Sequence, residues 1–422
     1  MTRRFDIDPF VNYVRNPERE SPINTAVARV VLGSYLVWKV LSLNWAAIEA
    51  WPAPVRYPVE PFLFPQVTIP LLGVEQWVLV AVLLAFTVGY RTRFASFVSA
   101  LFITHMAGIR LSYNASGGTE ALFLATYFLL LFGLYSDQDF LSADAARRTA
   151  DASATQLSRF LRENGRRTYR MNALRLSVLT LGILYFGAGL SKIVRNPGFS
   201  WTASDSLARY MAFNSYADHT YRPVAEFLFT EPLLLTASTW GTLALELGLL
   251  VAVLAGLSIT PFVLGLVGLH IVIALSVGPF FFDYVVFLSL FAAYDSALSR
   301  LTWGRSIDVI YDDRSRRCMR GLSLFRLLDT NRVLSFHPHS DAPAGYRDRL
   351  DPDATGKLHV FVDNEGYSGY RAFRELLARS RLFSPLALAM RTRPVESIGK
   401  RFFRYAVTER GHRFARDATD RE

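Results

Sequence analysis

Long apolar stretches alternate with short polar segments over the first two thirds of the chain. A membrane-spanning helix needs roughly 20 apolar residues, and backbone inside lipid must satisfy its own hydrogen bonds. The pattern between about residues 24 and 294 predicts eight such helices, at about 26–49, 74–90, 94–112, 118–135, 171–193, 233–255, 258–277 and 279–295. The last is the least regular, because Pro279 and Asp283 interrupt its start.

After about residue 305 the apolar runs become shorter and alternate with polar positions. This pattern predicts strands near 306–313, 332–336 and 357–363, with helices at 315–328 and 369–380. The expected fold class is an α-helical polytopic membrane bundle of about eight transmembrane helices plus a small soluble α/β domain. The corresponding domains are residues 1–300 and 301–422.

The positive residues predict the orientation of the spans. Arginines are dense before the first span, in the second and fourth connections and in the tail, whereas the first and third connections have one each, Arg56 and Arg110. Because cytoplasmic segments are enriched in Arg and Lys, both termini are expected in the cytoplasm. We therefore expect an integral, multi-pass protein of the plasma membrane.

The net charge of +10 does not indicate a nucleic-acid partner. The arginines flank apolar runs, where lipid headgroups explain them, and no basic patch interleaves with exposed aromatic residues. The lone Cys318 excludes an intramolecular disulfide. The first residues lack the apolar core of a cleavable signal peptide, so none is expected.

Several ionisable residues fall inside the predicted spans, and the orientation brings most of them to the outer half of the bundle. Charges at such depth usually face a cavity or pair with one another. The residues are Lys39, His105, Arg110, Glu120, Lys192, Glu246, His270 and Asp283. For Lys39 we favour an ion pair, and for His105 a packing role. Glu246 and His270 remain open between pairing and function.

Lys192 is the strongest candidate for chemistry. Only four of the 46 basic residues are lysines, and lysine, unlike arginine, can lose its charge when it is desolvated. Gly187 and Gly189 precede it and allow a helix or a ligand to approach closely. Trp201 follows it after a short polar gap.

The segment Tyr185-Phe-Gly-Ala-Gly-Leu-Ser-Lys192-Ile, followed by Trp201, resembles the vitamin K-dependent γ-glutamyl carboxylase family and its prokaryotic relatives, the HTTM proteins. The run that begins at His270 and leads to Phe282 and Tyr284 is similar to a later carboxylase segment. Asn114, ahead of a Gly-rich turn, is similar to an Asn-containing loop of the family. The resemblance covers roughly residues 20–300.

The resemblance implies quinol chemistry. In the carboxylase, the lysine that matches Lys192 is regarded as the base that deprotonates reduced vitamin K. The expected cofactor is therefore a reduced quinone, a vitamin K-type hydroquinone. Asn114, Glu120, Glu246, His270, Trp201 and His105 are the candidate quinol- or substrate-binding residues. The large lumenal domain by which the carboxylase positions its protein substrate has no counterpart here, so the acceptor, a peptide or a small molecule, stays open.

The stretch Tyr311-Asp312-Asp-Arg-Ser315-Arg-Arg-Cys318 resembles the DCC family of thioredoxin-like proteins, whose motif is Tyr-Asp-Gly-x-Cys-x-x-Cys. Ser315 stands where the first cysteine is expected. Dithiol exchange needs two cysteines, so the domain is expected to be degenerate, with a structural role or a cytosolic protein partner. Cys318 remains a monothiol redox candidate, because neighbouring arginines and a helix N-terminus can acidify it.

Three hypotheses for function follow. The leading one is a quinol-dependent, carboxylase-like membrane enzyme with Lys192 as base. The alternative is a non-catalytic scaffold or lipid-binding protein with a cytosolic docking domain, in which Lys192 pairs permanently with Glu246 or Glu120. A proton-relaying transporter would need paired broken helices or an internal repeat, and the sequence contains no convincing repeat.

Overall fold

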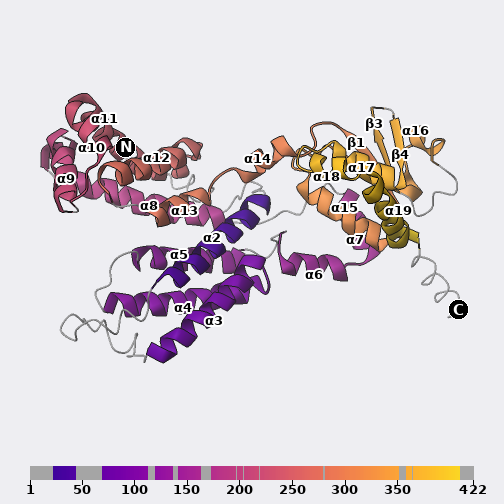
Figure 1. Cartoon of the computed structure of the whole chain (residues 1–422), viewed down its shortest axis with the longest axis horizontal. Coiled ribbons are helices and arrows are strands. Elements are labelled where there is room, and N and C mark those ends of the chain that lie inside the picture. Colours follow the sequence, from indigo (N-terminus) through magenta and orange to yellow (C-terminus); the bar gives the residue numbers. More distant parts are fainter. Residues whose placement is uncertain are drawn as a thin grey trace, which may run out of the picture. The chain divides into compact units, whose positions relative to one another are not determined.

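The chain forms two compact units in the computed structural model (Figure 1). The structure describes residues 22–43, 69–112, 119–135, 141–162, 173–195, 197–202, 204–217, 219–278, 281–350, 358–363 and 365–408. The first unit comprises Met1–Asp144 and Tyr169–Ala292, and the second comprises Ala145–Thr168 and Ala293–Glu422. Each unit has its own hydrophobic core.

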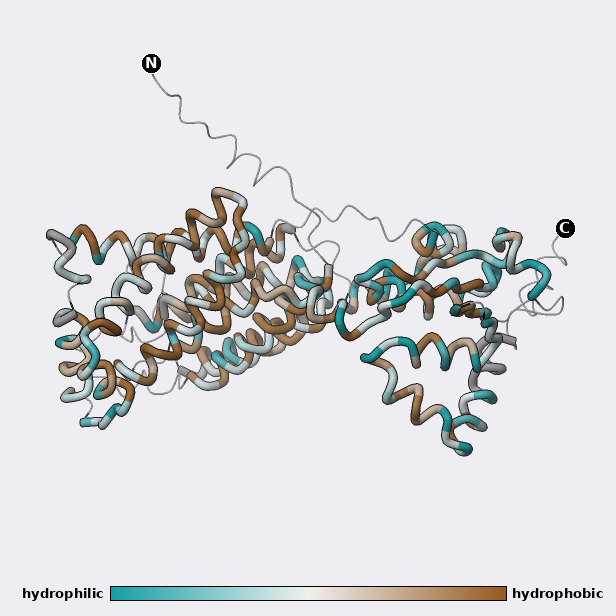
Figure 2. Tube along the Cα trace, turned by 90° about the horizontal axis from the view of Figure 1, so that it is seen from above, coloured by the Kyte–Doolittle hydropathy of each residue, from teal (hydrophilic) through white to brown (hydrophobic). Residues whose placement is uncertain are grey.

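Helices are the only regular secondary structure in the described residues of the first unit. Its longer helices are α2 (Pro22–Ser42), α3 (Ile69–Val88), α4 (Thr92–Ser112), α5 (Thr119–Tyr135), α8 (Ala173–Val194), α11 (Pro232–Leu254) and α12 (Thr260–Ser276). Shorter ones are η3 (Pro197–Thr202), α9 (Ser204–Ala217), α10 (Pro223–Thr230) and α13 (Phe282–Ser289). The helices of the first unit consist largely of hydrophobic residues (Figure 2), which is typical of helices in an apolar environment.

The helices of the first unit pack in a closed series. Successive neighbours in contact are α2–α3, α3–α4, α4–α5, α5–α8, α8–α11, α11–α12 and α12–α13, and α13 returns to α2. Their shared core includes Leu32, Phe86, Phe128 and Phe287, each fully buried. The closure brings α2 and α13 together although about 240 residues separate Lys39 from Asp283.

Two polar residues fix the turn between α3 and α4. The guanidinium of Arg29, fully buried, donates to the carbonyl oxygens of Phe86, at 3.0 Å, and of Thr87. These carbonyls belong to the last turn of α3, where the carbonyl oxygens have no hydrogen-bond partners within the helix. At the start of α4, the carboxylate of Asp144 accepts from the backbone nitrogens of Arg91 and Thr92, both at 2.9 Å.

Four helices in the described part of the chain are long and apolar enough to cross a membrane. They are Ile23–Ser42, Thr92–Arg110, Ala173–Val194 and Pro232–Leu254, with a fifth if α13 and α14 (Tyr294–Leu301) form one span. Three shorter apolar helices are Leu72–Val88, Ala121–Leu134 and Thr260–Ser276. The predicted helix at 279–295 is interrupted, because α13 ends at Ser289. The structure therefore supports membrane association through apolar helices.

The second unit is a mixed sheet with helices around it. Its strands are β1 (Ile307–Tyr311), β2 (Leu334–Pro338), β3 (His359–Val362) and β4 (Glu365–Ser368), in the order β2-β1-β3-β4. β1 pairs parallel with β2 and antiparallel with β3, and β4 is antiparallel to β3. Its helical elements are α6 (Ala143–Asp151), α7 (Ala154–Arg162), α14, α15 (Arg316–Leu328), η4 (His339–Asp341), α16 (Ala344–Arg347), α17 (Gly369–Ala378), α18 (Ser384–Ala389) and α19 (Arg393–Thr408).

Helix α15 forms the parallel crossover between β1 and β2. Ser315 is its N-cap: the hydroxyl accepts a hydrogen bond from the Cys318 backbone nitrogen at 3.3 Å, as serine often does at this position. At the other end, the Asp329 carboxylate accepts from the Val333 and Leu334 nitrogens. The Arg326 guanidinium lies 3.5 Å from that carboxylate and completes a buried cluster.

Helix α7 belongs to the core of the second unit, although the sequence analysis treats this segment as a connection between spans. Its buried residues Leu157 and Leu161 join the core cluster of the sheet and α15. The Ser158 hydroxyl lies 3.0 Å from the Tyr311 hydroxyl in a buried contact. Arg320 of α15 also donates to the carbonyl oxygens of Thr149 and Ala150.

Candidate functional site

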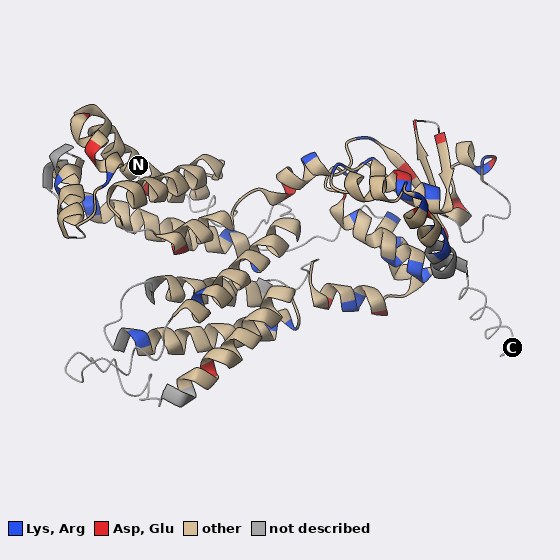
Figure 3. Ribbon diagram, in the orientation of Figure 1, with Lys and Arg blue, Asp and Glu red and all other residues tan. Residues whose placement is uncertain are grey.

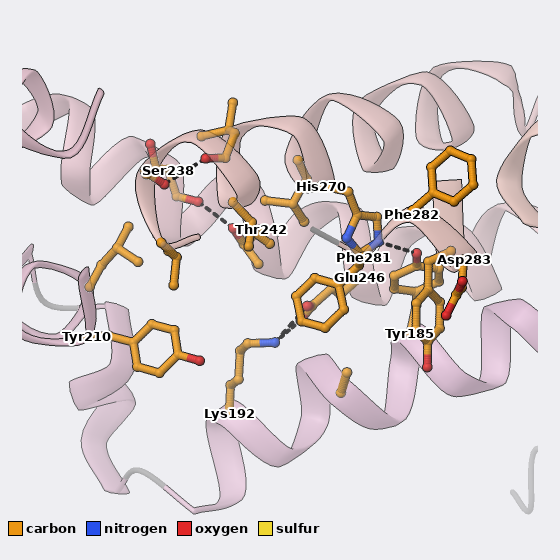
Figure 4. Close-up of a pocket in the computed structure, with 18 of the residues that line it drawn as sticks. Tyr185, Lys192, Tyr210, Ser238, Thr242, Glu246, His270, Phe281, Phe282 and Asp283 are labelled. Atoms are coloured by element: carbon orange, nitrogen blue, oxygen red, sulfur yellow. Dashed lines mark hydrogen bonds and ion pairs between the residues drawn. The ribbon is translucent and has the colours of Figure 1, made fainter. Parts of the chain in front are cut away.

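A cavity of about 820 Å³ lies among helices of the first unit. Helix α8 contributes Tyr185 and Lys192, which are seven residues apart and therefore lie on the same face of the helix, two turns from each other. The opposing wall includes Glu246 of α11 and His270 of α12 (Figure 4). Lys39 of α2 and Asp283 of α13 also line the cavity.

Lys192 and Glu246 form an ion pair at the cavity wall. The Lys192 Nζ atom lies 2.6 Å from Oε1 and 2.7 Å from Oε2 of Glu246. The Glu246 side chain is 9% exposed and that of Lys192 is 24% exposed. The ammonium also lies 5.3 Å from the centre of the Trp201 ring, a cation–π distance. Three of the predicted site residues, Lys192, Glu246 and Trp201, are therefore close together in the structure.

Gly189 allows α8 and α11 to approach closely at this pair. A Cβ atom added at Gly189 would lie 3.0 Å from Leu247 Cδ2 and 3.2 Å from Glu246 Cβ. A Cβ atom at Gly187 would have no heavy atom within 4 Å. Of the two glycines that the sequence analysis noted, Gly189 is therefore the one in close helix contact.

Tyr185 and His270 form a second polar pair on the cavity wall. The Tyr185 hydroxyl lies 2.6 Å from His270 Nε2, and the His270 ring stacks on Tyr284 at a centroid distance of 5.8 Å. His270 is 7% exposed, and its Nδ1 atom has no hydrogen-bond partner within the described part of the chain. If the tyrosine donates to Nε2, Nδ1 bears the proton of the neutral ring and is a donor available to a ligand.

Lys39 and Asp283 form a third polar group. Lys39 Nζ lies 2.9 and 2.8 Å from the two oxygens of Asp283, and the Tyr35 hydroxyl donates to Oδ1 at 2.6 Å. Lys39 is therefore in the ion pair that the sequence analysis favours. Through these contacts Asp283 ties α13 to α2. In Figure 4, Asp283 and the Lys192–Glu246 pair lie on either side of the Tyr185–His270 pair.

The remaining predicted residues of the first unit are elsewhere. His105 Nδ1 lies 2.7 Å from Glu75 Oε1, a contact between α4 and α3, and His105 is not among the residues that line the cavity. Glu120 lies in the first turn of α5, but its side chain, like the whole of Asn114, falls outside the described residues. Of the residues open between pairing and function, Glu246 pairs with Lys192 and His270 with Tyr185.

Sequence reasoning assigned no role to three tyrosines that the structure adds to the site, Tyr35, Tyr185 and Tyr284. A usable signal existed for two of them. Tyr35 is four residues before Lys39 and Tyr185 is seven before Lys192, spacings that put each tyrosine on the lysine's face of its helix. The contact of Tyr284 with His270 depends on helix packing and has no local signal.

Cys318 lies in the second unit, at the start of α15. The thiol is partly buried, and burial, followed by the negative charge of Asp312, raises its pKa from 9.0 to about 12. The expectation that the two neighbouring arginines lower the pKa of this thiol is therefore wrong. Arg316 and Arg317 are both exposed, and water screens their charge. The thiol stays protonated at neutral pH.

In the described residues, no group of three or more His, Cys, Asp or Glu side chains is arranged to hold a metal ion. No family model, curated protein or solved structure matches this chain.

Proposed function

We propose that this protein is a membrane enzyme that oxidises a reduced quinone, with the Lys192–Glu246 pair as proton acceptor. The observation that supports this most is an ion pair on the wall of a cavity large enough for a ring-shaped ligand. Its volume of about 820 Å³ falls in the range of about 300–1,000 Å³ typical of small-molecule sites. The resemblance around Lys192 to the γ-glutamyl carboxylase family supports the same chemistry.

The lining of the cavity suits a lipophilic ring with polar oxygens. Trp38, Leu184, Val272 and Phe282 line it and are each at least 38% exposed on apolar helices. In a bilayer such residues face lipid, which gives a hydrophobic ligand a lateral route into the cavity. Inside, His270 Nδ1 has no hydrogen-bond partner in the described residues, and it can donate to a ligand oxygen when the Tyr185 hydroxyl donates to Nε2. A reduced quinone, when bound, would supply ionisable ring hydroxyls and two electrons, for which we propose molecular oxygen as the oxidant, as the resemblance to the carboxylases implies.

The pair is suited to accept a proton because it is neutral as a whole. A carboxylate and an ammonium together take up one proton from a bound hydroxyl. The proton moves either to Glu246, or to Lys192 if the pair has first exchanged its own proton and become uncharged. Both routes end with a protonated Glu246 and a Lys192 ammonium. The positive charge then stabilises the oxygen that lost its proton.

The test compares Lys192→Arg with Glu246→Gln in proteoliposomes that contain a vitamin K-type hydroquinone. Lys192→Arg keeps the charge but cannot be discharged, so an amine base predicts loss of quinol oxidation. If Glu246 is the base and Lys192 acts only through its charge, Glu246→Gln loses the activity and Lys192→Arg keeps part of it. Binding of the quinone, measured through the quenching of Trp fluorescence, provides a second readout. Wild-type turnover in both variants would remove the proposal.

A second candidate is a non-catalytic scaffold or lipid-binding protein. It is favoured by the pairing of both cavity lysines with carboxylates, which is how buried charges join helices. This function predicts that the cavity holds a lipid acyl chain and that no quinone co-purifies. Extraction of the purified protein followed by mass analysis of the bound lipids discriminates between the two.

We propose further that the second unit is a degenerate thioredoxin-like domain of the DCC type. The β1–α15–β2 crossover, followed by an antiparallel β3–β4 pair in which β3 lies beside β1, supports this. With Ser315 as a helix cap and the pKa of Cys318 raised, a structural or docking role fits better than thiol exchange. The proposal of a membrane enzyme also includes eight membrane spans, cytoplasmic termini and a location in the plasma membrane. Its acceptor substrate would be a peptide or a small molecule.

A further inference from the structure

The cavity of the first unit extends on both sides of the Lys192–Glu246 pair. Figure 4 shows the Tyr185–His270 pair on one side of it and side chains that carry hydroxyl groups on the other. The hydroxyl groups of this second side, which we call the hydroxyl arm, come from α9 and α11. They belong to Ser206, Tyr210, Ser238 and Thr242, all of which line the cavity.

The arm follows one face of α11. Ser238, Thr242 and Glu246 are spaced four residues apart, so their side chains lie on the same face of the helix. Glu246 and Thr242 are buried, at 6 and 9% exposure, whereas Ser238 is half-buried. Ser238 lies about 12 Å from Glu246 along the helix axis. Exposure therefore increases along the arm with distance from the ion pair.

This direction leads toward the C-terminal end of α8. A Cβ atom added at Gly182 would lie 3.3 Å from Leu250 Cα, and one added at Gly189 would lie 3.2 Å from Glu246 Cβ. A later residue of α8 thus faces an earlier residue of α11, and the two helices are antiparallel. The side of Glu246 on which Ser238 lies is therefore the side on which α8 ends and η3 and α9 follow.

Helix α9, at the outer end of the arm, differs from the apolar helices of the first unit. It contains Asn214 and the exposed Arg209, and it is not among the helices that are apolar enough to lie in a membrane. Charged and amide side chains prefer water to lipid. Tyr210 of α9, which lines the cavity, is 56% exposed. The arm therefore leads from a buried ion pair to a surface that water reaches.

The hydroxyl groups of the arm can accept hydrogen bonds from water. Thr242 Oγ1 donates to the carbonyl oxygen of Ser238 at 2.8 Å, and Ser238 Oγ donates to that of Leu234 at 2.7 Å. Ser206 Oγ likewise donates to the carbonyl oxygen of Ser200. A hydroxyl has one proton and two acceptor lone pairs, so each oxygen can still accept a hydrogen bond. Several such acceptors in a polar, roomy site are what an ordered water needs.

We propose that water fills the hydroxyl arm and carries the proton accepted by Glu246 to the aqueous face at which α8 ends. The inference rests on the proposed function, which places a proton on Glu246 in each turnover. The Glu246 carboxyl gives this proton to a water molecule of the arm, which leaves as hydronium, and the ion pair with Lys192 re-forms. The opposite side suits a charge less well, because Phe281 and Phe282 line the cavity there. Thr242, one turn from Glu246, positions the first water.

The first experiment measures whether water reaches Thr242. The full chain with Cys318→Ser and Thr242→Cys is placed in lipid nanodiscs and treated with a charged methanethiosulfonate reagent. Leu243→Cys is the matched control, because Leu243 is buried on the same helix but does not line the cavity. A buried thiol reacts only after local opening, so the cysteine at 242 should react at least about tenfold faster. Equal rates overturn the proposal, as does protection of 242 by a vitamin K-type quinone, which would make the arm part of the ligand site.

The second experiment measures hydroquinone turnover in Thr242→Val. Turnover should fall about two- to tenfold, the effect of one lost hydrogen bond, and the solvent deuterium isotope effect should rise while quinone binding stays unchanged. Thr236→Val is the control, since Thr236 makes the same bond within α11, to Pro232 O at 3.0 Å, but does not line the cavity. Unchanged turnover and isotope effect in Thr242→Val overturn the proton route. Absence of turnover in the wild type refutes the proposed function and the route with it, whereas slow labelling at 242 in an active protein refutes the water-filled arm alone.

Discussion

Glu246 presents both carboxylate oxygens to the Lys192 ammonium, at 2.6 and 2.7 Å. Lys192 is the only hydrogen-bond partner of Glu246 in the described residues. Asp283, by contrast, accepts from Tyr35 as well as from Lys39. The two lysine–carboxylate pairs of the cavity therefore differ. The carboxylate of Asp283 is held by two side chains, whereas that of Glu246 depends on one and is the easier of the two to reach with a proton.

The first prediction concerns the cost of breaking this pair. Lys192→Met leaves a largely buried carboxylate without its cation, and we expect a loss of about 3 kcal/mol of stability, at the lower end for a broken buried pair because Lys192 is 24% exposed. The double variant Lys192→Met, Glu246→Leu removes both charges and should recover most of that loss. Thermal unfolding in detergent measures both.

The matched control is Lys400→Met, which breaks the exposed pair between Lys400 and Glu396 on α19. Its unfolding temperature should stay close to that of the wild type, because exposed pairs contribute little. If the double variant is no more stable than Lys192→Met alone, the two side chains are not coupled as the distances imply.

The second prediction uses the two glycines before Lys192. Gly189→Val places side-chain atoms where Leu247 and Glu246 Cβ already lie at 3.0–3.2 Å from the Cβ position, so α8 and α11 must separate. We expect a destabilisation of about 1–3 kcal/mol, the usual cost of overpacking. Quinone binding should weaken as well, because Glu246 moves away from Lys192.

Gly187→Val provides the comparison, since its Cβ atom meets nothing within 4 Å. Both substitutions put the same side chain into the same helix, so intrinsic helix propensity cancels between them. Equal unfolding temperatures for the two variants would contradict the close approach at Gly189.

Hydrophobic patterning predicted the positions of α8 and α11 well. α8 begins and ends within two residues of the predicted 171–193, and α11 is within one residue of 233–255. The pattern of hydrophobic residues gives the position of a helix in the sequence, but it does not show which other helices pack against it. The pairing of Lys192 with Glu246, 54 residues later, and of Lys39 with Asp283 depends on which helices pack together, which hydropathy does not encode.

Helix α7 shows a different limit of sequence reasoning. Its arginines are typical of a cytoplasmic connection, and this signal concealed the apolar positions Leu157 and Leu161, four residues apart on one face. Their burial requires the sheet and α15, which lie about 150 residues later in the chain. Similarly, Arg316 and Arg317 next to Cys318 indicated an acidic thiol, but burial of the thiol decides its pKa.

The third prediction links α7 to the reactivity of Cys318. A pKa near 12, compared with 9.0 for an unperturbed thiol, lowers the thiolate fraction at neutral pH about a thousandfold. Maleimide labelling of the native chain should therefore be slow and should accelerate when the second unit unfolds. The same shift destabilises the native state between pH 9 and about 12, because the unfolded thiol loses its proton there while the native thiol keeps it.

Leu161→Ala should release this protection. Leu161 is 1% exposed in the core of the second unit, and truncation of a buried leucine costs about 2–5 kcal/mol. Since the labelling rate follows the population of the open unit, Cys318 should react at least about tenfold faster than in the wild type. Thr155→Ala, at an exposed position of the same helix, should leave the rate unchanged. An unaltered rate in Leu161→Ala would mean that α7 does not contribute to the stability of the unit that contains Cys318.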